Sequence, residues 1–231
     1  MRLKAVLFDA TDTLFRMRGS VGRVYASVAA RHGVRVGATD IEPRFRAAFH
    51  AMPVLAFPGV PESALPDCER AWWKRVVAAT FDGHRFSDFD AFFADVFQEF
   101  AGTRNWQLFS DTVPALTALR ARGLQLAIVS NFDGRLTQIC DGLGLRNLFE
   151  TIVLSTRAGY AKPDPAIFQA AVQRLGVRCS EALHVGDSEL EDLVGARNAG
   201  LQSLLIVRNG ALQGSVNLLT DLRELADRIH S

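Results

Sequence analysis

The stretch LKAVLFDATDTL, residues 3–14, contains the segment that decides the fold. Its first half, Leu3 to Phe8, is short and apolar, and it runs directly into a polar cluster that starts at Asp9. A short apolar run that ends at polar residues predicts a buried β-strand. The polar cluster is a candidate functional site, because ligands of open α/β sheets bind beyond the carboxyl ends of the strands.

Four more runs of this kind follow later in the chain, and stretches with helical spacing separate them. Strands that alternate with helices predict a parallel sheet with helices on both faces, so we expect an α/β fold with a Rossmann-like core. The expected strands are 124–129, 151–154, 182–185 and 203–207, and the expected helices are 112–122, 135–142, 165–175 and 189–198.

Residues 16–109 interrupt this alternation. We expect no clear buried strand there, because apolar residues such as Phe93 and Phe97 recur at helical spacing. Most of the 16 phenylalanines lie in this stretch, and core packing is the simplest role for them. We therefore predict a core made of residues 1–15 and 110–231, and an inserted helical cap made of residues 16–109.

The composition is that of an ordinary folded protein. The chain has 231 residues, of which 48% are hydrophobic and 22% charged, and its formal net charge is +1. A charge so close to zero gives no support to binding of nucleic acid or of an anionic membrane. Cys68, Cys140 and Cys179 are widely spaced, which argues against a disulfide framework or a structural zinc site. This cysteine usage fits a reducing compartment, so we expect a cytoplasmic protein. The first apolar run is too short for a signal peptide or a membrane helix.

Acids, a hydroxyl and a lysine follow the expected strands, and these side chains favour phosphate chemistry. Asp9, Asp187 and Asp192 offer the hard oxygen ligands that Mg²⁺ prefers. Ser130 and Lys162 offer donors for the oxygens of a phosphate. A carboxylate beside a metal ion and a lysine is also a candidate nucleophile towards phosphorus.

Four separated motifs in a fixed order resemble the haloacid dehalogenase (HAD) superfamily of hydrolases, in its branch with a helical cap. The resemblance covers the whole chain, because the cap of that branch is inserted after the first motif. Within the superfamily the chain is most similar to the subgroup called haloacid dehalogenase-like hydrolase domain-containing protein three, which shares Trp72-Trp73. The four motifs are Phe8 to Leu14, Val129-Ser130-Asn131, Lys162-Pro163-Asp164-Pro165 and Gly186 to Asp192.

The resemblance implies a nucleophile and a metal site. Asp9 is expected to attack phosphorus and to form an aspartyl-phosphate. Mg²⁺ is expected to be held by Asp9, the main-chain carbonyl of Thr11 and Asp187, with Asp192 assisting directly or through water.

The resemblance also implies how the substrate is bound. Ser130, with the main-chain amide of Asn131, and Lys162 are expected to bind the phosphoryl group, and Lys162 joins Asp9 as a catalytic residue. The expected partner is a small phosphorylated molecule, and neither nucleic acid nor a membrane is expected. The sequence predicts neither the identity of the substrate nor the oligomeric state.

One position departs from the pattern of the superfamily's phosphatases. They usually carry a second Asp two residues after the first, as general acid and base, and this chain has Thr11 there. A threonine hydroxyl does not exchange protons near neutral pH as a carboxyl does, and general acid–base catalysis typically contributes about 10²–10⁴-fold in rate. We therefore expect slow turnover, above all for poor leaving groups. Asp12 is either a replacement acid or a turn residue, and the turn role is favoured.

Three functions are compatible with this sequence. A Mg²⁺-dependent phosphatase ranks first, because the acidic pair Asp187 and Asp192 is not expected in the metal-independent dehalogenases. A 2-haloacid dehalogenase and a catalytically weak module that binds phosphoryl groups are the alternatives. His184 lies inside an expected strand and is interpreted as a packed, hydrogen-bonded core residue.

Overall fold

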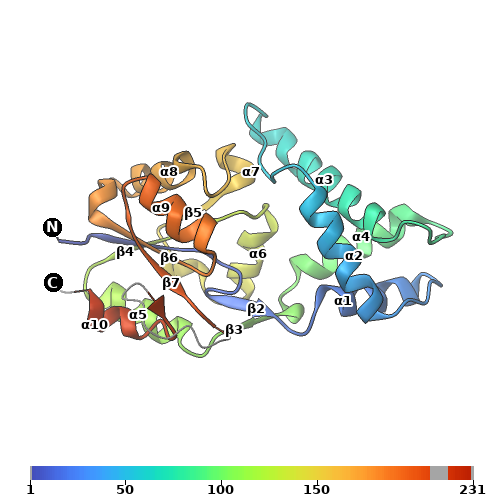
Figure 1. Ribbon diagram of the computed structural model, residues 1–231, viewed down its shortest axis with the longest axis horizontal. Coiled ribbons are helices and arrows are strands. Elements are labelled where there is room, and N and C mark those ends of the chain that lie inside the picture. The colour runs from blue at the N-terminus through green and yellow to red at the C-terminus, as the bar shows by residue number, and fades with distance from the viewer. Residues whose placement is uncertain (1, 209–217, 230–231) are drawn as a thin grey trace.

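The computed structural model describes residues 2–208 and 218–229, and a six-stranded parallel sheet lies at its centre (Figure 1). In spatial order the strands are β5 (Thr151–Leu154), β4 (Gln125–Ser130), β1 (Ala5–Phe8), β6 (Ala182–Gly186), β7 (Gln202–Ile206) and β8 (Leu218–Leu219). The chain adds β4 and β5 on one side of β1 and then returns to add β6 on the other side. The strand order therefore reverses at β1, and ligands of doubly wound sheets bind at such a reversal point.

Helices cover both faces of this sheet. Along β1, Val6 and Phe8 pack into the core on one face, while Ala5 and Leu7 pack into the core on the other. All four side chains are fully buried, which explains why the strand is a continuous apolar run rather than an alternating one. One face carries α5 (Thr112–Ala121), α6 (Arg135–Gly142) and α10 (Glu224–Arg228), and the other carries α8 (Pro165–Leu175) and α9 (Gly195–Asn198).

Four α-helices between residues 21 and 101 lie beside the sheet, and we call them the cap helices (Figure 1). They are α1 (Val21–Arg31), α2 (Ala38–Ala51), α3 (Leu65–Thr80) and α4 (Phe89–Ala101). Their own core is aromatic, and Tyr25, Phe81 and Phe92 are among its buried members. The rings of Phe81 and Phe92 meet edge to face with centroids 4.9 Å apart. Core packing is therefore the main role of the phenylalanines in this part of the chain.

A small second sheet joins the cap helices to the central sheet. β2 (Phe15–Met17) pairs with β3 (Trp106–Leu108) in antiparallel register. The sequence analysis expected no clear buried strand in residues 16–109, and it missed these two short, partly exposed strands at the ends of the stretch. Each strand has three residues and mixed burial, which is too short for a period-two pattern to be seen. The domain limits themselves, at 15/16 and 109/110, stay a prediction.

The expected strands are all present, with ends shifted by at most two residues. The expected helix 189–198 is divided into a widened π turn, η5 (Glu189–Val194), and α9. Among the described residues, no helix combines the length and the apolar character needed to cross a membrane. The remaining short helices are α7 (Ser155–Ala158), η1 (Glu62–Ala64), η2 (Thr103–Asn105), η3 (Arg146–Leu148) and η4 (Cys179–Glu181).

Candidate active site

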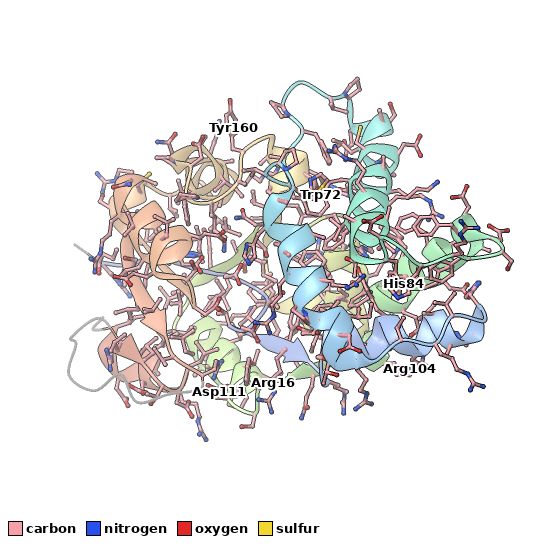
Figure 2. The ribbon with its side chains drawn as sticks, turned by 45° about the vertical axis from the view of Figure 1, so that its right-hand side comes forward. Arg16, Trp72, His84, Arg104, Asp111 and Tyr160 are labelled. Atoms are coloured by element: carbon pink, nitrogen blue, oxygen red, sulfur yellow. The ribbon has the colours of Figure 1, made fainter. Side chains whose placement is uncertain are left out.

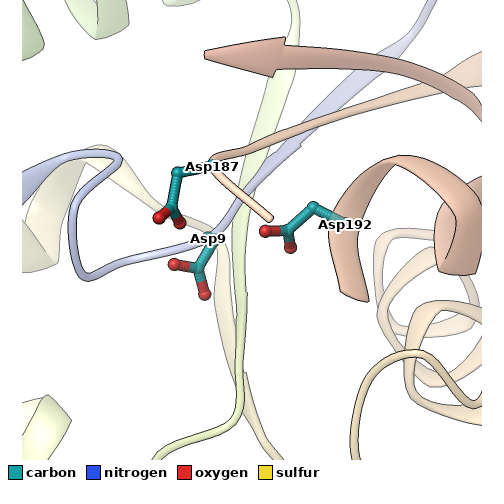
Figure 3. Close-up of side chains that lie close together, drawn as sticks. All are labelled: Asp9, Asp187 and Asp192. Atoms are coloured by element: carbon teal, nitrogen blue, oxygen red, sulfur yellow. The ribbon is translucent and has the colours of Figure 1, made fainter. Parts of the chain in front are cut away.

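The expected acidic residues come together at the carboxyl edge of the sheet. Asp9 follows β1, Asp187 follows β6, and Asp192 lies on η5. Figure 3 shows the three carboxylates gathered around one space. One oxygen of each lies within 4.8 Å of the others. The parallel pairing of β1 with β6 thus brings together acids that are far apart in the sequence.

Lys162 links two of these carboxylates. Its Nζ donates to Oδ1 of Asp9 and to Oδ1 of Asp192, at 2.6 Å each, and the residue is only 4% exposed. Burial alone would lower the pKa of Lys162, but the two carboxylates hold that pKa above its usual value, so the ammonium keeps its charge. Burial raises the pKa of Asp9, and the Lys162 charge opposes that rise. The three side chains form a buried ion-pair network in which every member depends on its partners.

Asp192 is held by three donors. Its Oδ1 accepts hydrogen bonds from Lys162 and from Nε2 of His184, the latter at 2.8 Å, and its Oδ2 accepts from the main-chain N–H of Ser188 at 3.0 Å. Burial would raise the pKa of Asp192, but Lys162 and His184 hold it below its usual range. A Cβ on Gly186 would lie 2.1 Å from Cγ of Asp192, so this approach requires glycine.

His184 is fully buried on β6, and its ring meets Phe168 edge to face. The interpretation as a packed, hydrogen-bonded core histidine is confirmed. Its contact with Asp192 was not predicted, although His184 precedes the Gly186-Asp187 motif by only two residues. The His184 side chain therefore helps to hold Asp192 in place from the buried side of the site.

Asp187 is the one of these three acids whose negative charge Lys162 does not offset by direct contact. Its carboxyl lies next to Asp9 (Figure 3), although the residue as a whole is exposed. Burial of the carboxyl, followed by repulsion from Asp9 and Asp192, raises the pKa of Asp187 to about 7. Three acids therefore share a space with Lys162 as the cation in direct contact with two of them. A small divalent cation with oxygen ligands fits this donor set and relieves the repulsion.

Asn131 and Ser130 occupy the end of β4. Nδ2 of Asn131 donates to the main-chain carbonyl of Lys162 at 2.9 Å, and Oδ1 accepts from the N–H of Lys162 at 2.7 Å. Nδ2 also donates to Oε2 of Glu191, a neighbour that the sequence analysis did not single out. Ser130 is 3% exposed at the last position of the strand. The Asn131 side chain thus holds the loop that carries Lys162.

Thr11 and Asp12 lie in the turn between β1 and β2. Oγ1 of Thr11 is buried, and it has no hydrogen-bond partner among residues 2–208 and 218–229. Asp12 adopts φ +58°, and its N–H donates to the carbonyl of Phe15 at 2.7 Å. Asp tolerates this left-handed conformation better than most residues do. The backbone of Asp12 therefore occupies a turn position, and the residue lines a cavity beneath the cap helices, so its role as a replacement acid stays a prediction to be tested.

A polar contact attaches the cap helices to the start of α6. Nε1 of Trp73 donates to Oδ2 of Asp133 at 2.5 Å, and Arg135 binds the same carboxylate through Nε and Nη2. Glu69 accepts from the N–H of Gly134 at 3.1 Å. We call these five residues the cap contact. Trp73 and Arg135 of the cap contact also line the cavity beneath the cap helices.

Comparison with known proteins gives the family. A family model of haloacid dehalogenase-like hydrolases matches residues 3–200. The chain is 39% identical over 219 residues to haloacid dehalogenase-like hydrolase domain-containing protein 3 of Mus musculus, across 94% of this chain and 86% of that protein. A glyceraldehyde 3-phosphate phosphatase of Methanopyrus kandleri is 37% identical over 101 residues, which is 43% of each chain.

The fold is shared with solved enzymes as well. An L-2-haloacid dehalogenase, PA0810, superposes with a TM-score of 0.74 at 21% identity, over 98% of both chains. At that identity the likeness concerns the fold alone. With four motifs meeting at one sheet edge and a family match over most of its length, the chain belongs to the haloacid dehalogenase-like hydrolases, in the domain-containing protein 3 subgroup.

Proposed function

We propose that this hydrolase is a Mg²⁺-dependent phosphatase that acts on a small phosphorylated molecule through Asp9. The observation that carries the proposal is the contact of Asp9 with Lys162 at 2.6 Å, beside Asp187 and Asp192. An anionic phosphate can approach an aspartate only where positive charge is concentrated, and this edge of the sheet offers an ammonium and a set of cation ligands.

Asp9 is the nucleophile in this proposal. One of its oxygens bonds to phosphorus while the bond from phosphorus to the leaving-group oxygen breaks, and the leaving group departs with the electron pair. Water then attacks phosphorus, which releases inorganic phosphate and restores Asp9. Asp9, Asp187 and the Thr11 carbonyl would hold Mg²⁺, which when bound draws the phosphate towards the nucleophile and offsets its charge.

The remaining residues bind and position. Ser130, the main-chain amide of Asn131 and Lys162 bind the phosphoryl oxygens. Asp192 accepts three hydrogen bonds, so in this proposal it orients Lys162 and reaches the metal through water. The similarity to a glyceraldehyde 3-phosphate phosphatase supports phosphate chemistry over dehalogenation.

The test is turnover of 4-nitrophenyl phosphate with and without Mg²⁺. We expect hydrolysis that a chelator abolishes and that added Mg²⁺ restores, and we expect Asp9→Asn to remove it. Asp90→Asn is the matched control, because Asp90 is an exposed cap residue paired with Lys74. Activity that survives Asp9→Asn would exclude Asp9 as the nucleophile. Metal-independent release of halide from a 2-haloacid, without phosphatase activity, would establish the dehalogenase alternative instead.

A further inference from the structure

A cavity of about 680 Å³ is lined at one end by Thr11 and Asp12, which follow the proposed nucleophile by two and three residues. It lies between the cap helices and β2 and β3. This volume is within the usual range of small-molecule sites. Because Thr11 and Asp12 follow Asp9 in the chain, the cavity is the space that we assign to the leaving group of an ester bound at Asp9.

The wall of the cavity is aromatic. Trp73, Phe97, Phe100 and Phe132 line it and are half-buried, so part of each ring is open to the cavity. The guanidinium of Arg135 lies 4.1 Å from the centroid of Phe97 and is already bound to Asp133, so it adds a flat surface to the same wall. Aromatic rings pack best against other flat rings, in offset or edge-to-face arrangements.

The opening of the cavity carries positive charge. Arg16, Arg18 and Arg46 line it and are exposed, and Arg16 lies where β2 meets the cap helices (Figure 2). The carboxylate of Glu42 also lines it, but its oxygens accept from Arg46 at 3.3 Å and from the N–H of Gly22 at 2.6 Å. Asp12 also lines the cavity and is exposed, so the three exposed arginines face two carboxylates. The balance stays positive, which favours an anionic ester.

Thr11 restricts the chemistry of the leaving group. It stands two residues after Asp9, where the phosphatases that this chain resembles usually carry a second Asp as general acid, and its hydroxyl is buried with no partner within the described part of the chain. Without a proton donor the leaving group departs as an oxyanion and takes its proton from solvent afterwards. A phenol, with a pKa of about 10, leaves in this way far more readily than an aliphatic alcohol.

We infer that the substrate of this chain is a phosphate ester of a planar aromatic alcohol with a phenol-like hydroxyl. The inference rests on the proposed function and adds the class of the leaving group to it. The aromatic wall selects the ring, and Thr11 selects the acidity of the hydroxyl.

Three esters separate these two effects in the wild-type, Mg²⁺-loaded enzyme: phenyl, benzyl and cyclohexylmethyl phosphate. Phenyl and benzyl phosphate share a ring but differ in leaving-group acidity, and we expect kcat/KM for phenyl to be higher by about 10²–10⁴-fold. Benzyl and cyclohexylmethyl phosphate share an aliphatic oxygen, and we expect kcat/KM for benzyl to be higher by roughly two- to tenfold. Equal values within either pair overturn the inference.

Variants assign the effects to residues. Thr11→Asp is expected to raise kcat/KM for benzyl phosphate more than for phenyl phosphate. Phe97→Leu is expected to remove the preference for benzyl over cyclohexylmethyl phosphate. Phe86→Leu, in the aromatic core of the cap helices but outside the cavity wall, is the matched control and is expected to keep that preference.

Asp12→Asn tests whether Asp12 donates a proton to the leaving group. Asparagine suits this position because it also tolerates a positive φ. It is expected to leave the ratio of phenyl to benzyl unchanged. If it slows benzyl phosphate alone, Asp12 already supplies the proton and the inference is overturned. Hydrolysis that depends on Asp9 but shows no preference among the three esters overturns this inference and leaves the proposed function intact, whereas no Asp9-dependent hydrolysis of any ester overturns the proposed function.

Discussion

At the sheet edge, Asp9, Lys162 and Asp192 are buried and charged, and each makes hydrogen bonds of fixed geometry. Beneath the cap helices, the cavity has aromatic walls, and its exposed arginines lie at the opening. The sheet edge depends on buried charges that each need a specific partner, so a single substitution leaves a charged partner unpaired. The cavity depends on the combined size and flatness of several side chains, so a single substitution there is tolerated better.

The largest effect is expected from Lys162→Met, which removes the cation of the sheet edge and keeps much of the side-chain volume. Asp9 and Asp192 then lose their partner in a buried setting, which should lower the free energy of unfolding by about 3–5 kcal/mol. Loss of an electrostatic contact to the reacting phosphate should lower kcat by about 10²–10³-fold. Denaturant unfolding in the presence of chelator and turnover of 4-nitrophenyl phosphate measure the two quantities.

Lys74→Met is the control for this variant. Lys74 pairs with Asp90 at 2.5 Å, but both side chains are substantially exposed. We expect a change in the free energy of unfolding of less than about 1 kcal/mol, since exposed ion pairs contribute little. Equal losses of unfolding free energy for Lys162→Met and Lys74→Met would contradict the difference between buried and exposed ion pairs.

A smaller effect is expected from Trp73→Phe, which keeps the aromatic wall and removes the hydrogen bond of the cap contact to Asp133. The loss of a donor to a buried carboxylate should lower the free energy of unfolding by about 1.5–3 kcal/mol. The matched variant is Trp72→Phe, because Nε1 of Trp72 donates at 2.9 Å to the carbonyl of Pro53 within the same insertion. Only Trp73→Phe should raise KM for phenyl phosphate. A rise in KM of the same size in both variants would mean that the cap contact does not shape the cavity.

The smallest effect is expected from Asp187→Asn, and it has the opposite sign. Without a cation, Asp187 is repelled by Asp9 and Asp192, so removal of its charge should stabilise the metal-free protein. About 1 kcal/mol corresponds to a rise in Tm of roughly 2–4 °C for a chain of this size. Mg²⁺ should raise the Tm of the wild-type protein and raise that of the variant less. Identical Mg²⁺ responses in thermal unfolding would remove Asp187 from the metal site.

The sheet and the acidic cluster were predictable because both depend on local patterns. Apolar runs such as Ala5–Phe8 mark strands buried on both faces, and polar residues that directly follow parallel strands must meet at one edge. The same reasoning failed for β2 and β3. A strand of three residues is too short to show a period-two alternation, and the pairing of β2 with β3 joins segments about ninety positions apart in the sequence.

The sequence by itself determined the α/β class, the helical nature of the insertion and the meeting of Asp9 with Asp187 and Asp192. Only the tertiary structure decided how these charges are paired: Lys162 between Asp9 and Asp192, His184 beneath them, and the side chain of Asn131 turned to the lysine loop. It also decided the shape of the cavity, whose wall includes Trp73 of the cap contact. The positions of the strands follow from local hydrophobic patterns, whereas strand order, charge pairing and cavity shape depend on segments distant in the sequence that meet only after folding.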